Sequence, residues 1–168
     1  MKQPIPLAKG IRELSILATF AALLVAVQVG LSFLPNIELV SLLILLMVQK
    51  FGWKSLLPVW TFALVEGLIF GFHIWWINYL YIWPIWVLLI MLFKKSDHPL
   101  LLAILAGIFG LLFGSLCSLP YFLTGGWGAG FGYIISGIPF DLIHGVSNFI
   151  LVLLLYRPLS RCLQKILK

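Results

Sequence analysis

Long apolar stretches separated by short polar turns run through the whole chain, and they predict membrane-spanning helices. Six such stretches are expected as spans, at residues 14–33, 37–48, 56–72, 78–93, 99–122 and 133–156. Because backbone groups in lipid must be hydrogen-bonded within each segment, helices are the expected structure. The second stretch is short for a bilayer core, which needs about 20 residues, so it must be shielded by its neighbours or begin in the outer interface. The expected fold class is therefore all-α: one polytopic membrane domain of six helices over residues 1–168.

Positive charge collects at alternate turns between these stretches. All 11 Lys and Arg residues fall in the amino-terminal segment, the second and fourth turns, and the carboxyl-terminal tail. They are Lys2, Lys9, Arg12, Lys50, Lys54, Lys94, Lys95, Arg157, Arg161, Lys165 and Lys168. Cytoplasmic loops are enriched in Lys and Arg, so both termini are expected in the cytoplasm. This topology also explains the net charge of +6 without a nucleic-acid partner.

Three acidic residues do not follow this charge pattern. Glu38, Glu66 and Asp141 fall in the outer half of the expected bundle, where the sequence places no Lys or Arg. Ionisable groups at membrane depth cost several kcal/mol and tend to mark functional sites. Asp141, His144 and Asn148 also share one face of the last helix, at i, i+3 and i+7. The pattern predicts a site that hydrogen-bonds a polar small molecule; the alternative is an internal network in which Asp141 holds His144.

Aromatic residues gather between residues 75 and 86, around the expected outer turn. An interfacial aromatic belt explains many of them, but their density also suggests that one or more rings face a ligand. The predicted substrate-binding residues are Glu38, Glu66, Trp76, Asn78, Asp141, His144 and Asn148. The glycine-rich turn at 124–132 lacks a phosphate-binding pattern and is expected to be a flexible loop or a mobile lid with Trp127 at its tip.

Small residues form stripes on two of the expected helices. Ala18, Ala22 and Ala26 share one face of the first, and small residues recur from Ala103 to Ser118 on the fifth. Such stripes allow close helix approach in lipid. For the fifth helix we expect packing within the chain, whereas for the first a partner protein is an equally reasonable occupant.

Motifs for catalysis and metal binding are lacking. The sequence contains no H-E-x-x-H, no G-x-S-x-G and no nucleotide-binding loop, so we expect no enzymatic activity and no cofactor. Histidine and carboxylates could bind a metal, but no tight spacing between them supports this.

The chain resembles the substrate-binding membrane subunits, or S components, of energy-coupling factor (ECF) vitamin transporters. The resemblance covers essentially all of the chain and rests on six expected spans in a small basic protein and on the Ala22-x-x-x-Ala26 pair. It also rests on two local stretches, Leu34-Pro35-Asn36-Ile37-Glu38-Leu39 and Ser136-Gly137-Ile138-Pro139-Phe140-Asp141-Leu142-Ile143-His144.

This resemblance implies a function. The chain would capture a vitamin-like molecule in an outward-facing pocket of the bacterial plasma membrane. Its Ala18, Ala22 and Ala26 face would dock on a membrane coupling subunit of the EcfT type, which is bound to two cytoplasmic ATPases. The chain would thus be the binding subunit of an ABC-type importer, with ATP hydrolysed on other subunits.

One departure from the family narrows the expected substrate. Nickel and cobalt members have a histidine next to the initiator methionine, whereas this chain begins Met1-Lys2-Gln3, so metal uptake is not expected. A pocket with acidic groups and aromatic rings, but no cation, suits a neutral or cationic aromatic heterocycle such as a pyridine, pyrimidine or thiamine-like compound. The alternative function is a non-catalytic membrane scaffold of the MreD type, which would need no ligand pocket.

Overall fold

Six α-helices and one short 3₁₀ helix make up the chain over residues 7–167, the part that this computed structural model describes. They are α1 (Leu7–Gly30), α2 (Val40–Phe51), η1 (Gly52–Ser55), α3 (Leu56–Phe70), α4 (Ile74–Leu92), α5 (Pro99–Cys117) and α6 (Leu119–Leu167). No strand occurs among these residues, so the all-α prediction is confirmed. Lys2, Lys168 and the side chain of Lys9 lie outside the described part.

Within residues 7–167, five stretches are long and apolar enough to cross a membrane. They are Gly10–Gly30, Val40–Phe70, Ile74–Leu92, Pro99–Cys117 and Leu119–Leu167. The second stretch joins α2, η1 and α3, which are separate helices because Gly52 adopts a φ of 58° at the junction. With 12 residues, α2 is about 18 Å long at 1.5 Å per residue, well short of a bilayer core of about 30 Å.

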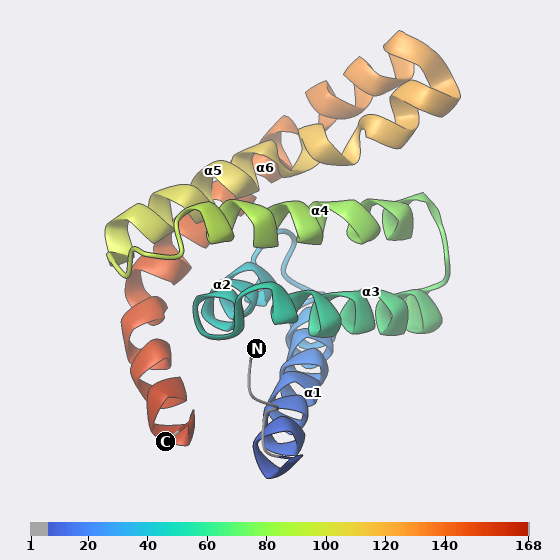
Figure 1. Cartoon of the computed structure of the whole chain (residues 1–168). Helices are drawn as coiled ribbons and strands as arrows, with labels where there is room; N and C mark the ends of the chain where they lie inside the picture. Colours follow the sequence, from blue (N-terminus) through green and yellow to red (C-terminus); the bar gives the residue numbers. More distant parts are fainter. Residues whose placement is uncertain (1–6, 168) are drawn as a thin grey trace.

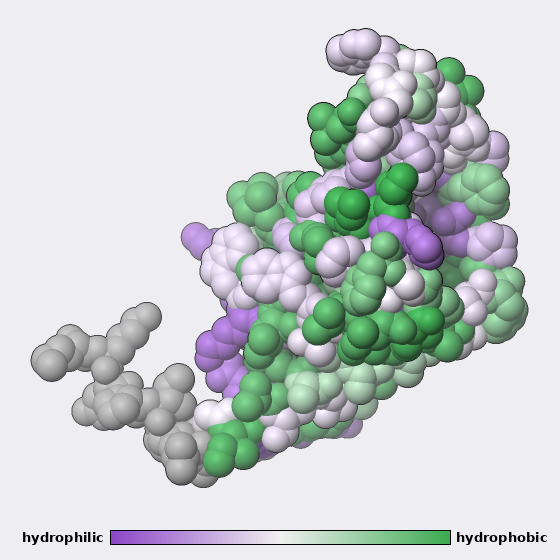
Figure 2. All heavy atoms as spheres, turned by 90° about the vertical axis from the view of Figure 1, so that its right-hand side faces the viewer, coloured by the Kyte–Doolittle hydropathy of each residue, from purple (hydrophilic) through white to green (hydrophobic). Residues whose placement is uncertain are grey.

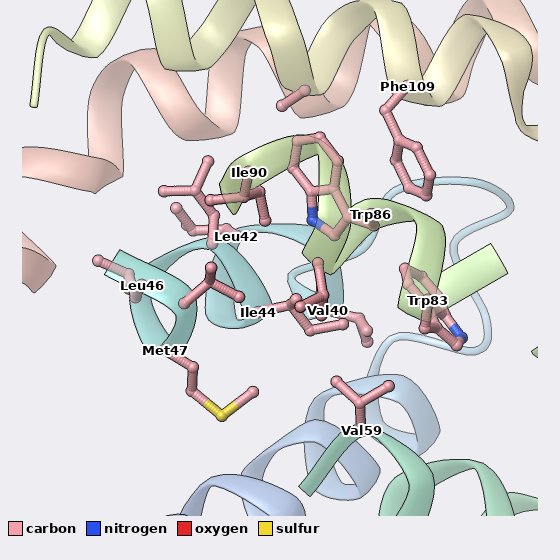
Figure 3. Close-up of a cluster of buried hydrophobic side chains, with 14 of the residues drawn as sticks. Val40, Leu42, Ile44, Leu46, Met47, Val59, Trp83, Trp86, Ile90 and Phe109 are labelled. Carbon is pink, nitrogen blue, oxygen red and sulfur yellow. The ribbon is translucent and has the colours of Figure 1, made fainter. Parts of the chain in front are cut away.

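The short helix α2 lies at the centre of the molecule, where neighbouring helices shield it. Eight of its residues are buried, from Val40 to Val48, and it contacts α1, α4 and α6. Figure 3 shows its side chains packed against Trp86 of α4, with Val59 of α3 and Phe109 of α5 nearby. Trp86 stacks on Phe109 with ring centroids 4.5 Å apart. The expectation that a short second helix would need shielding is therefore confirmed.

Helices α5 and α6 form a long hairpin that extends beyond the other helices, at the upper right of Figure 1. The expected loop at 124–132 is wrong: helix continues on both sides, and the chain reverses at Gly126, whose φ is 72°. Glycine weakens a helix by about 1 kcal/mol per residue, but aromatic contacts hold the two arms together. Phe122 packs on Phe131 at 5.3 Å, and Tyr121 stacks on Tyr133 at 4.3 Å.

The small-residue stripe of α5 packs against α6, as expected. A Cβ atom on Gly110 would meet the Gly145 backbone at 2.8 Å, and one on Gly107 would meet Phe149 Cβ at 3.2 Å. Small residues at such crossings let helix backbones approach and gain van der Waals contact. This stripe is therefore occupied within the chain.

Replacing Gly110 with valine should separate α5 from α6. Because the added side chain would meet backbone rather than a movable side chain, we expect Gly110→Val to destabilise the protein by about 1–3 kcal/mol. Thermal unfolding in detergent measures this. Gly132→Val is the matched control, since no atom lies within 4 Å of a Cβ built there; equal loss of stability in both variants would contradict the close-packing interpretation.

Candidate ligand-binding site

A small, partly open cavity of about 210 Å³ lies beside the segment that joins α1 to α2. Its other walls come from α4, α5 and α6. The polar and aromatic side chains that line it are Gln28, Ser32, Asn36, Glu38, Tyr79, Trp83, Phe113 and His144. Its mixed polar and aromatic lining is suited to a small molecule, although its volume is below the roughly 300–1,000 Å³ of typical ligand pockets.

Glu38 and His144 meet at one wall of this cavity. His144 Nε2 lies 3.3 Å from Glu38 Oε1, and Glu38 Oε2 accepts a 2.8 Å hydrogen bond from the Ser41 backbone N–H. Glu38 therefore closes the first turn of α2 and orients His144.

Two further bonds converge on Ser41 behind this wall. The Asn148 amide donates to Ser41 Oγ at 3.3 Å, and the Trp86 indole N–H donates to the Ser41 carbonyl at 3.0 Å. All three side chains are buried. Asn148 therefore anchors α6 to α2 and does not line the cavity.

Two buried nitrogen atoms at the cavity walls have no hydrogen-bond partner among the described residues. They are Trp83 Nε1 and His144 Nδ1. A buried polar group without a partner costs about 1–3 kcal/mol, and such exceptions in a folded protein require an explanation. A bound molecule that hydrogen-bonds these atoms would remove that cost.

A second recess, of about 410 Å³, adjoins the first, since both are lined by Asn36 and Phe113. Asp141 lines this recess, and its Oδ1 accepts the Gly114 backbone N–H at 2.9 Å. The Ser147 hydroxyl donates to the Asn36 carbonyl at 2.9 Å, which ties the α1–α2 segment to α6. Figure 2 views the end from which the hairpin extends and shows hydrophilic surface in a hollow below it, amid apolar surface.

The remaining predicted residues line neither space. Glu66 is buried in α3 with Oε1 unpartnered among the described residues. The Trp76 indole donates to the Ala63 carbonyl at 2.9 Å, and Asn78 Oδ1 accepts from the Tyr81 hydroxyl at 2.9 Å. Of the seven predicted residues, Glu38 and His144 thus reach the first cavity and Asp141 the second.

Six of the polar and aromatic cavity residues were not among the predicted substrate-binding set: Gln28, Ser32, Asn36, Tyr79, Trp83 and Phe113. Tyr79 and Trp83 lie four residues apart in the aromatic run, and this spacing could have identified them as one face of a helix. Gln28 is a lone amide in an apolar helix, which is also a usable signal. Nothing in the sequence distinguishes Phe113 from the other phenylalanines.

The described residues contain no cluster of three or more His, Cys, Asp or Glu side chains suited to a metal ion. No family model, curated protein or solved structure matches the chain. What the protein does is therefore inferred from its own residues and geometry.

Two tryptophans of α4 should respond differently to the loss of their indole nitrogen. Trp86→Phe removes the indole donor to the buried Ser41 carbonyl, so it should cost about 1 kcal/mol more than Trp83→Phe, which breaks no hydrogen bond. Thermal unfolding of the ligand-free protein compares them. If Trp83→Phe is the more damaging variant, Trp83 Nε1 has a partner in the folded protein.

Proposed function

We propose that this protein is the substrate-binding subunit, or S component, of an ECF-type importer in the bacterial plasma membrane. It would cross the membrane six times with both termini in the cytoplasm. The observation on which the proposal rests is the presence of two separate sites: a small polar and aromatic cavity, and an unfilled groove lined by the alanine stripe of α1.

The cavity suits a single-ring aromatic heterocycle. An apolar cavity of about 150 Å³ holds benzene, so 210 Å³ accommodates one substituted ring. Tyr79 and Phe113 supply aromatic surfaces, Trp83 supplies a hydrogen-bond donor, and Glu38 disfavours an anionic substrate. Single-ring pyridines and pyrimidines meet these conditions, a two-ring thiamine-like compound exceeds the volume, and a carboxylate-rich vitamin would require a cation.

The groove suits a helix of a coupling subunit. It measures about 600 Å³ and lies between α1 and α3, with Ala18, Ala22 and Ala26 on one side and Leu57 and Thr61 on the other. The three alanines are exposed rather than packed within the chain. Small side chains that remain uncovered permit close approach by a partner helix in lipid, and an EcfT-type subunit bound to two cytoplasmic ATPases is the proposed partner.

The placement of the basic residues supports the proposed orientation. Lys54 pairs with Glu13 of α1 at 2.7 Å, and the Gln49 amide before Lys50 donates to the Ser96 carbonyl after Lys95 at 3.1 Å. Arg12 of α1 donates to the Ile166 carbonyl of α6 at 2.9 Å. These bonds bring the amino-terminal segment, two basic turns and the tail together, as cytoplasmic segments would be.

The ligand should depend on the indole nitrogen of Trp83. We expect Trp83→Phe to weaken binding about tenfold, the equivalent of one hydrogen bond of about 1.4 kcal/mol. Thermal stabilisation by a panel of pyridine, pyrimidine and thiamine-like compounds measures this, after native mass spectrometry of protein purified from cells has identified any retained molecule.

Trp60→Phe is the matched control for this measurement, because Trp60 is half exposed on α3 and lines no cavity. Binding that is unchanged in Trp83→Phe would reject the first cavity as the site. Absence of any retained or stabilising compound would favour the alternative, a scaffold of the MreD type.

Assembly with the coupling subunit should depend on the small size of Ala22. We expect Ala22→Trp to leave folding and ligand binding intact but to abolish co-purification with the coupling subunit, because the indole would fill the groove. Leu23→Trp is the control, since Leu23 is exposed on α1 outside the groove. Normal assembly of Ala22→Trp would exclude this face as the docking surface.

A further inference from the structure

A polar recess of about 380 Å³ shares no lining residue with either proposed site. It is formed by the last turn of α2, the α4–α5 turn and the last turns of α6. Its charged and polar lining includes Lys50, Asp97, Arg157, Ser160, Arg161 and Gln164. The bond from Gln49 to the Ser96 carbonyl holds two of these walls together.

One continuous face of α6 supplies most of the hydrogen-bond donors. Arg157, Ser160, Arg161 and Gln164 follow the spacing i, i+3, i+4 and i+7, which places their side chains on one side of the helix. Leu163, outside this series, is buried. The recess is thus lined mainly by one regular side of α6 and not by loop residues.

The charge in this recess is unbalanced. Three cations, Lys50, Arg157 and Arg161, surround one carboxylate, Asp97. Among the described residues no carboxylate lies within salt-bridge distance of these cations, whereas Lys54 has Glu13 at 2.7 Å. Two like charges four residues apart on a helix repel each other, so an anion in the recess would stabilise this arrangement.

We propose that this recess binds the phosphate group of an anionic membrane lipid. Arginine forms paired hydrogen bonds with phosphate oxygens, and lysine adds a point charge from the opposite wall. Basic pockets between membrane helices bind anionic headgroups. Leu153 and Leu154 are exposed on α6 one turn before Arg157 and provide apolar surface along which the acyl chains can lie.

The lipid is favoured over a soluble phosphate because the recess opens next to that apolar surface. It is favoured over an acidic protein segment because the donors line a concave space rather than a flat or protruding surface. This site is independent of the transported substrate and does not use the cavity or the groove.

The test compares two double variants that remove the same charge. We expect Arg157→Gln/Arg161→Gln to retain about tenfold less phosphatidylglycerol in native mass spectrometry than the wild type. Lys95→Gln/Lys165→Gln should retain it fully, because both lysines are exposed and line no recess. Lys50→Gln, on the opposite wall, should also lower retention.

Vesicles supply the second readout. Phosphatidylglycerol mixed into phosphatidylcholine should raise the unfolding temperature of the wild type and the lysine control but not of the arginine variant, while all unfold alike in phosphatidylcholine alone. If both double variants lost phosphatidylglycerol retention and stabilisation equally, the effect would come from net charge, and the proposed site would be rejected. Equal protection by inorganic phosphate, or a loss only of coupling-subunit assembly, would overturn the lipid assignment.

Discussion

The structure depends on the burial of the short helix α2, because the polar groups of its first turn must find hydrogen-bond partners within the protein instead of water. Helix α2 is too short to reach both faces of a bilayer, so its first turn lies inside the protein. Glu38 accepts the Ser41 N–H there, and Asn148 and Trp86 use the remaining polar atoms of Ser41. Buried polar groups are tolerated when hydrogen-bonded, and here they fix α2 against α4 and α6.

The same constraint separates polar groups that are hydrogen-bonded within the protein from buried ones that have no partner. Glu38, Ser41 and Asn148 are engaged within the protein, whereas Trp83 Nε1 and His144 Nδ1 have no partner among the described residues. His144 shows both conditions: its Nε2 contacts Glu38, whereas its Nδ1 has no hydrogen-bond partner among the described residues. Under the proposed function, recognition in this cavity would rely on a few hydrogen-bond donors and aromatic side chains more than on the acidic residues singled out in the sequence.

The apolar pattern predicted the helices well, because long apolar segments of the kind compatible with a membrane span can satisfy their backbone groups only as helices. It failed at residues 124–132, where the glycines suggested a loop. The chain is instead helical up to the reversal at Gly126, and contacts between Phe122 and Phe131 hold the two arms together. Asp141, His144 and Asn148 lie on one side of the same helix, yet their surroundings differ. Asp141 lines the second recess, His144 lines the first cavity, and Asn148 hydrogen-bonds Ser41. Helix periodicity specifies the face, whereas the partners on α2 and α5 decide what each side chain meets.

The connection between α1 and α2 has a mechanical consequence. It continues the helix whose alanines line the groove, and it also forms one wall of the cavity. The Ser147 hydroxyl donates a hydrogen bond to the Asn36 carbonyl of this connection, and Asn36 adopts a left-handed backbone conformation. A tilt of α1 would therefore displace this cavity wall, and under the proposed function docking at the groove would be mechanically coupled to the cavity through this one short connection.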